Sequence, residues 1–197
     1  GINTSYKDAL GHAKRVASLY GNVEVVLIYN PSGRSDQSME HIAKTLSGGT
    51  TTAAEVTHAV LKDALERGQR VLTVCHSEGS MNVGVAVNKI SKALRKNLYI
   101  DAYGTPYPLG PNNAFEVRNF VNKADYVYRL GSSVKALSRP AIDTKDSKTV
   151  TTFLDSAKAD AYNIAGAGDH AFEGKNYSER LAKNGKDYKD IYLKRDI

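Results

Sequence analysis

Residues 71–95 constrain the fold more than any other part of the chain, because they predict a strand, a tight turn and a helix in immediate succession. The apolar run Val-Leu-Thr-Val-Cys of residues 71–75 is typical of a buried strand. A turn with the sequence His-Ser-Glu-Gly follows at residues 76–79, and apolar residues then recur at helical spacing: Val83, Ala86, Val87, Ile90 and Leu94. This order predicts that Ser77 lies at the tip of the turn, above the carboxyl end of a strand.

A serine in that position is the setting of a nucleophile elbow, whose pattern is G-x-S-x-G. Cys75 replaces the first glycine of the pattern, and Gly79 supplies the last. The turn lifts the hydroxyl of Ser77 above the strand and directs the N–H of Glu78, at the start of a helix, toward an oxyanion formed there. Ser77 is therefore the leading nucleophile candidate. The competing interpretation is an ordinary serine- and glycine-containing turn, which the substitution by Cys75 favours.

Strands and helices alternate through the rest of the chain. The sequence predicts one domain over residues 1–197, of the α/β class, with three α/β/α layers and a mainly parallel sheet. Thr4 or Ser5 is predicted to cap the first helix. We expect residues 131–149 to form a mobile excursion, and a polar helix and tail from Tyr177 onward, with 182–197 as the tail. The predicted helices are 6–20, 37–46, 52–66 and the one after the elbow, and the predicted strands are 23–29, 71–75, 97–102, 117–121 and 160–164.

Ligand sites of parallel α/β sheets lie outside the carboxyl ends of the strands, and Ser77, Asp125 and His170 all fall at such ends. A serine hydroxyl needs an imidazole as its base and a carboxylate to orient that imidazole. His170 is the one histidine in a glycine-rich loop after a predicted late strand. Asp125 directly follows the strand predicted at 117–121. Asp101, at the end of the preceding predicted strand, stays open as the alternative acid.

The elbow and the chain order serine, aspartate, histidine resemble the α/β-hydrolase superfamily in its small lipase- or esterase-like form. Less closely, Gly1-Ile2-Asn3-Thr4 and the elbow look like a group of uncharacterised chlamydial hydrolase-like proteins. The resemblance implies that Ile2 or Asn3 supplies a second oxyanion N–H, with residues 30–33 as the alternative. It also implies that the first strand or strands of the fold are absent from this chain, so a preceding segment or a partner chain is expected to supply the missing strand.

The predicted function is a serine hydrolase that cleaves a carboxylic ester or thioester, with a lipid-like acyl substrate, through an acyl-enzyme. Tyr103 and Tyr107, in the tyrosine- and proline-rich loop 103–111, are expected to line the substrate site, together with Phe115. Triad chemistry needs no cofactor, and the sequence carries no zinc, calcium, phosphate-loop or dinucleotide signature. We therefore expect neither a cofactor nor a metal.

The net charge of +6 is the main feature that favours a different class of function. It suits an anionic membrane surface, which stays open as a partner. The basic residues are spread through the chain without interleaved aromatic residues, so nucleic-acid binding is not expected. Two alternatives remain: a non-catalytic α/β-hydrolase-like interaction protein, and a basic membrane- or nucleic-acid-binding module. No apolar run is long enough for a membrane span, and the compartment is not assigned.

Overall fold

Four parallel strands form the centre of the molecule in the computed structural model. The described residues are 4–31, 40, 43–45, 49–110, 113–122, 125, 127–128, 148–154 and 175–188. The strands are β1 (Val71–His76), β2 (Leu98–Tyr103), β3 (Glu116–Asn122) and β4 (Lys148–Leu154). Their spatial order is β1-β2-β3-β4, and every neighbouring pair is parallel. The carboxyl ends of all four strands therefore lie at one edge of the sheet.

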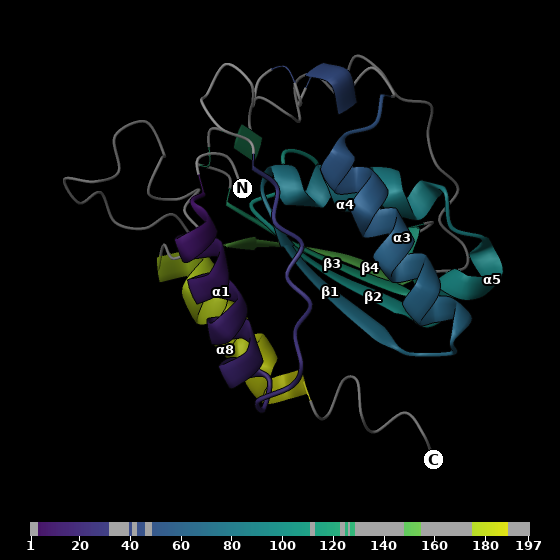
Figure 1. Cartoon of the computed structure of the whole chain (residues 1–197). Helices are drawn as coiled ribbons and strands as arrows, with labels where there is room; N and C mark the ends of the chain where they lie inside the picture. The colour runs from purple at the N-terminus through teal and green to yellow at the C-terminus, as the bar shows by residue number, and fades with distance from the viewer. Residues whose placement is uncertain are drawn as a thin grey trace.

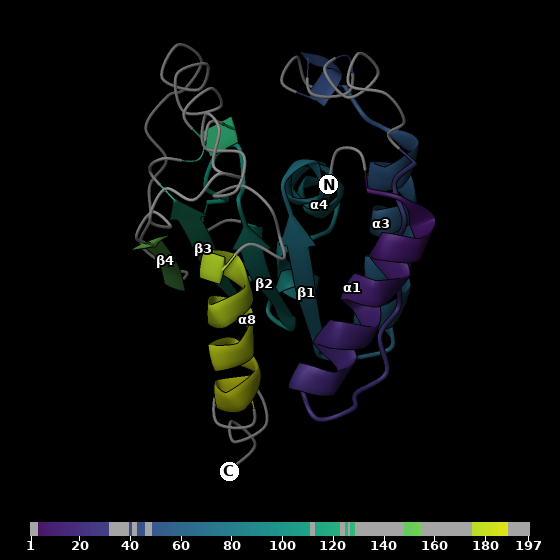
Figure 2. The ribbon, with the colours of Figure 1, turned by 90° about the vertical axis from the view of Figure 1, so that its left-hand side faces the viewer.

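Helices cover both faces of this sheet (Figure 1). On one side lie α3 (Thr52–Glu66) and α4 (Glu78–Asn88), and the short α5 (Lys92–Arg95) leads from α4 into β2. On the other side, α1 (Tyr6–Leu19) and α8 (Lys175–Tyr188) form a second layer, which faces the viewer in Figure 2. The predicted α/β class with three layers and a parallel sheet is thereby confirmed.

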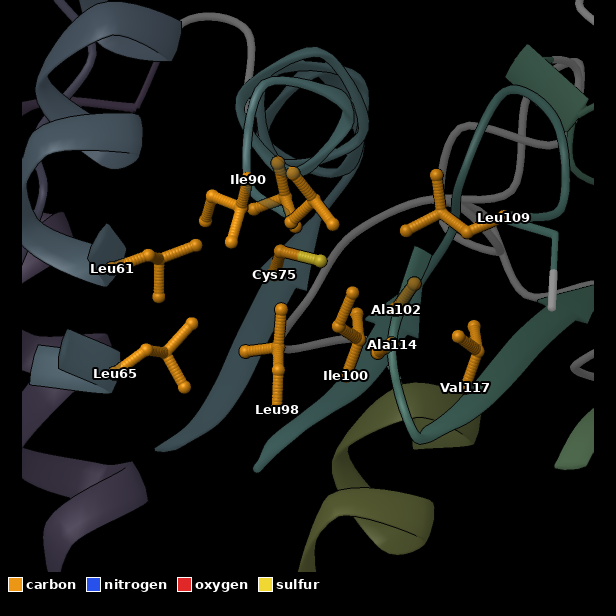
Figure 3. Close-up of a cluster of buried hydrophobic side chains, with 12 residues drawn as sticks. Leu61, Leu65, Cys75, Ile90, Leu98, Ile100, Ala102, Leu109, Ala114 and Val117 are labelled. Carbon is orange, nitrogen blue, oxygen red and sulfur yellow. The ribbon is translucent and has the colours of Figure 1, made fainter. Parts of the chain in front are cut away.

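Strand β2 separates two apolar cores, because successive side chains of a strand point to opposite faces. All six of its residues are buried. Leu98, Ile100 and Ala102 belong to the core under α3 and α4, which Figure 3 shows with Cys75 beside Leu98 and Ile90. The core under α1 and α8 is aromatic and contains Tyr20, Tyr103, Phe120, Tyr177 and Leu181. Full burial of one such side chain contributes about 1.5–3 kcal/mol.

The beginnings of two helices follow from local hydrogen bonding. The Ser5 hydroxyl oxygen accepts a hydrogen bond from the Asp8 N–H (3.1 Å), so Ser5 rather than Thr4 caps α1. The Thr51 hydroxyl does the same for the Ala54 N–H (3.1 Å) at the start of α3, whose bounds match the prediction. Such a cap contributes about 1 kcal/mol relative to alanine.

Two predictions about strands are wrong. Residues 23–29 form no strand, although their sequence is largely apolar, because no strand of the described part of the chain pairs with them. Conversely, β4 begins at Lys148, inside the segment expected to be an excursion, where the polar Thr-Val-Thr-Thr run pairs with β3. Residues 182–188, expected in the tail, belong to α8. Most of 37–46, the excursion up to residue 147 and the strand predicted at 160–164 lie outside the described residues.

Candidate active site

Ser77 occupies the sharp turn that the sequence predicts. It directly follows β1 and directly precedes the first residue of α4, with backbone angles φ 54° and ψ −129°. A non-glycine residue at positive φ is uncommon, and a residue held in a sparsely populated region costs about 1–3 kcal/mol. Hydrogen bonds hold the turn in place: the Ser77 N–H donates to the Tyr103 carbonyl (3.0 Å), and the Ser77 carbonyl accepts from the Ser80 N–H (3.0 Å).

The Ser80 side chain links the elbow to the loop after β2. Its hydroxyl oxygen lies 2.6 Å from the Ser77 carbonyl oxygen and 2.8 Å from the Thr105 hydroxyl oxygen, and Ser80 is fully buried. This contact links the turn at Ser77 to Thr105, just beyond the end of β2. Ser77 is itself almost completely buried, with 1 % of its surface exposed.

The elbow accepts Cys75 in the place of its first glycine. A Cβ atom added to Gly79 would lie 4.0 Å from the Cys75 Cβ, which is an ordinary van der Waals contact. The Cys75 thiol points into the core under α3 and α4 and donates to the Asp101 carbonyl at 3.7 Å. Burial, followed by the nearby Asp101 carboxylate, raises the pKa of this thiol well above its ordinary value. The thiol therefore stays protonated and is not a nucleophile.

Glu78 brings a second segment of the chain to the elbow. Its side chain is buried, and its Oε1 accepts a hydrogen bond from Asn30 Nδ2 at 2.8 Å. Asn30 thus lies beside the first turn of α4, where backbone N–H groups and the helix dipole favour a negative charge. Residues 32–33, and Ile2 and Asn3, lie outside the described residues, so the second oxyanion N–H stays a prediction.

Asp125 lies three residues beyond the carboxyl end of β3 and is fully buried. Its Oδ1 accepts from the N–H groups of Val127 (2.8 Å) and Tyr128 (3.4 Å). Its Oδ2 accepts from the Tyr177 hydroxyl at 2.9 Å, and that hydroxyl in turn accepts from the Asn122 N–H at 3.2 Å. Donors on both oxygens hold this carboxyl group in a fixed orientation.

Tyr177 also connects this acid to the elbow. The ring of Tyr177 lies edge-on to the ring of His76, with the two centroids 6.0 Å apart, and His76 is the residue before Ser77. The structure thus brings the environments of Asp125 and Ser77 to the same edge of the sheet. His170 lies outside the described residues, so its position relative to both stays a prediction.

Asp101, the alternative acid, has a different role. It lies inside β2 rather than at its end, because the strand continues to Tyr103. Its carboxylate forms a bidentate ion pair with Arg118 on β3, at 2.7 Å to Nε and 2.6 Å to Nη2. The Tyr20 hydroxyl also donates to it, at 3.3 Å. Asp101 is therefore engaged in joining two strands and α1, and the geometry favours Asp125 as the acid of the site.

The expected substrate wall needs a correction at Tyr103. This residue is the last of β2, fully buried in the aromatic core, where it stacks on Phe120 with 4.9 Å between ring centroids. Its hydroxyl oxygen accepts from Asn184 Nδ2 at 2.6 Å. Burial and the neighbouring Asp101 raise its pKa. Tyr107 lies in the loop as expected, half-buried against the core under α3 and α4.

Two partners of the site, Ser80 and Tyr177, were missed by sequence reasoning, whereas Asn30 belongs to the segment 30–33 that was expected as the alternative oxyanion donor. The hydroxyl of Ser80 follows the elbow by three residues, which is a detectable spacing. Tyr177 lies 52 residues beyond Asp125, in a polar helix that carries no motif, so no sequence signal could have assigned it.

Comparisons with known proteins assign no relative: no family model, no curated protein and no solved structure matches this chain. Among the described residues, no three histidine, cysteine, aspartate or glutamate side chains are grouped so that they could hold a metal ion. The same residues include no helix with the length and hydropathy needed to cross a membrane.

Proposed function

We propose that the protein is a serine hydrolase in which Ser77 attacks the acyl carbon of an ester or thioester. The observation that carries this proposal is the backbone of Ser77, at φ 54° and ψ −129° between the end of β1 and the start of α4. Strained residues of this kind persist where the surrounding structure holds them, and they concentrate at functional sites. A serine without a role at the tip of the turn would gain stability from replacement by glycine.

In this proposal the other residues of the site transfer protons or stabilise charge while Ser77 attacks. His170 takes the proton of the Ser77 hydroxyl as the oxygen bonds to the acyl carbon, and Asp125 orients and stabilises the imidazolium. The N–H of Glu78 donates to the oxyanion. The carbon–oxygen or carbon–sulfur bond to the leaving group then breaks, and His170 passes its proton to that group. In the second half, water loses a proton to His170 as its oxygen bonds to the acyl carbon. The bond between the acyl carbon and the Ser77 oxygen then breaks, and His170 returns the proton to that oxygen, which releases the acid.

The loop after β2 supplies the side chains that would contact the acyl group. Tyr103 and Leu109 pack into the cores, so the loop after β2 offers Tyr107 as its partly exposed apolar side chain on the side of Ser77. Phe115 does not line this site as expected, because its N–H donates to the carbonyl of Leu98 (3.0 Å), the first residue of β2, at the opposite edge of the sheet. We therefore propose a short acyl chain in place of a long lipid chain, and p-nitrophenyl esters from acetyl to decanoyl separate the two.

Labelling with a fluorophosphonate probe tests the nucleophile. Wild type is compared with Ser77→Ala and His170→Ala, and with Ser91→Ala as a matched control, because Ser91 is an exposed serine that caps α5 without a side-chain hydrogen bond. We expect label on wild type and Ser91→Ala alone, on the peptide that contains residue 77. A folded wild type that takes no label, or label that persists in Ser77→Ala, would contradict the proposal and favour a non-catalytic binding protein.

A further inference from the structure

The loop between β2 and β3 is held beside the first turns of α4, the helix that follows the elbow. The N–H of Gly104, the first residue after β2, donates to the Phe120 carbonyl on β3 at 2.9 Å. The next residue, Thr105, is fully buried, and its hydroxyl oxygen lies 2.8 Å from that of Ser80 on α4. The same hydroxyl donates to the Tyr107 carbonyl. The start of the loop is thus fixed to both β3 and α4.

One side chain of β3 holds the far end of the loop. Asn119 Oδ1 accepts a hydrogen bond from the Leu109 N–H at 2.9 Å, and Asn119 Nδ2 donates to the Leu109 carbonyl at 3.1 Å. Both residues are buried, so the amide of Asn119 pairs with the loop as the backbone of a neighbouring strand would. Buried backbone groups that lose their partners are costly, and this side chain therefore fixes the position of Leu109.

Helix α4 meets the same leucine from another side. A Cβ atom added to Gly84 would lie 3.1 Å from Leu109 Cδ2, which is closer than nine in ten contacts of real Cβ atoms. Leu109 belongs to the core under α3 and α4, together with Ala102 and Val117 (Figure 3). Leu109 is therefore held by β3 and by α4 at once, and the loop cannot shift without disturbing one of these contacts.

Tyr107 lies between the two fixed ends of the loop. Pro106 and Pro108 flank it, and their rings restrict the backbone of the loop at Thr105 and at Tyr107 itself. The side chain is partly buried, and the start of the loop places it near the elbow, because the Ser80 hydroxyl contacts both Thr105 and the elbow. With so little backbone freedom, Tyr107 is a fixed surface beside the candidate nucleophile.

We propose that Asn119 is a positioning residue that sets the length of the acyl chain that the protein accepts. It acts through Leu109, by holding the loop against α4 so that contact with Tyr107 limits the chain. This inference rests on the proposed serine hydrolase function and adds to it the determinant of chain length. One methylene group more or less in an apolar contact changes relative rates about tenfold or more, so a small displacement of the loop is enough to alter selectivity.

Replacing Asn119 by leucine tests the proposal, because leucine is similar in size and can form neither hydrogen bond. Asn184→Leu is the matched control: Asn184 is also buried, and its amide donates to the Tyr103 hydroxyl in the aromatic core under α1 and α8. The measured quantity is the ratio of kcat/KM for p-nitrophenyl decanoate to that for p-nitrophenyl acetate. A ratio measured on one preparation does not depend on the fraction of the protein that is folded.

We expect the ratio to rise about tenfold in Asn119→Leu and to keep its wild-type value in Asn184→Leu. Gly84→Ala pushes Leu109 from the side of α4 and removes no hydrogen bond, so the ratio should rise there as well. This variant decides the question if Asn119→Leu does not fold. Amide hydrogen exchange at Leu109 should become faster in Asn119→Leu, and this readout does not depend on catalysis.

Three results would overturn the proposal. They are an unchanged ratio in Asn119→Leu (or in Gly84→Ala, if the former does not fold), an equal rise in Asn184→Leu, and unchanged amide exchange at Leu109. If the wild type takes the fluorophosphonate label at Ser77 and gives one of these results, the hydrolase proposal stands and only the role of Asn119 is wrong. A folded wild type that takes no label and hydrolyses neither ester overturns both.

Discussion

Replacing Tyr177 by phenylalanine removes one oxygen atom from the buried network around Asp125. The Tyr177 hydroxyl donates to Asp125 Oδ2 at 2.9 Å and accepts from the Asn122 N–H at 3.2 Å, and the residue has no exposed surface. A hydrogen bond to a charged group contributes about 1.5–3 kcal/mol, and one between neutral groups about 1 kcal/mol. The substitution should therefore lower the free energy of unfolding by about 2–4 kcal/mol.

Tyr103→Phe is the matched control, because it removes an equally buried hydroxyl from the same aromatic core. That hydroxyl accepts from Asn184 Nδ2 at 2.6 Å and does not contact Asp125. We expect a smaller loss of about 1–2 kcal/mol, since its partners Asn184 and Tyr20 are both uncharged. Urea unfolding followed by circular dichroism measures both variants.

Tyr177→Phe and Tyr103→Phe should differ in the rate at which Ser77 is labelled. Tyr177→Phe loosens the carboxylate that orients His170, so the rate of fluorophosphonate labelling at Ser77 should fall about tenfold or more. Tyr103→Phe should be labelled at close to the wild-type rate. Both variants are compared under conditions in which the urea curves show them to be folded. Equal labelling rates in the two variants would refute a positioning role for Tyr177 and leave it as a purely structural residue. An unchanged free energy of unfolding in Tyr177→Phe would refute the buried network itself.

Three further predictions concern the framework. Asp101→Asn should lower the free energy of unfolding by about 3–5 kcal/mol in urea, because it leaves Arg118 in a buried site without its counter-charge. The double variant Asp101→Leu with Arg118→Met should recover most of that loss, because both charges are then removed. Gly185→Ala should cost about 1–3 kcal/mol, because its Cβ would clash with the Leu19 backbone, 2.8 Å from the carbonyl carbon, while Gly79→Ala should be tolerated. Burial raises the pKa of the Cys75 thiol, so native protein at pH 8 should resist alkylation by iodoacetamide. The folded state keeps the proton that the unfolded thiol releases, so the free energy of unfolding should fall as the pH rises above 9.0, the ordinary pKa of a cysteine thiol. Rapid alkylation of folded protein, a neutral Gly185→Ala or a harmless Asp101→Asn would each contradict the packing described.

Local patterns were sufficient to predict α1, α3, the elbow and three of the four strands. Each of these depends on contacts near in sequence: a capping hydroxyl three residues before the N–H that donates to it, an apolar period, or a small residue in a tight turn. The same reasoning could not find β4, whose Thr-Val-Thr-Thr run is polar by composition and becomes a strand by pairing with β3. It also could not exclude a strand at residues 23–29, whose apolar sequence lacks only a partner.

By itself, the sequence determined that a serine lies at the tip of a strand–turn–helix and that the chain forms a parallel α/β sheet. Only the tertiary structure distinguishes the surroundings of Asp125 from those of Asp101, since these depend on Tyr177 and Arg118, which lie 52 and 17 residues away. It also moved Tyr103 from the expected substrate wall to the core. The physical reason is the same in each case: the chemical role of a carboxylate or a phenol depends on the donors, charges and solvent around it, and distant segments of the chain supply these only after folding.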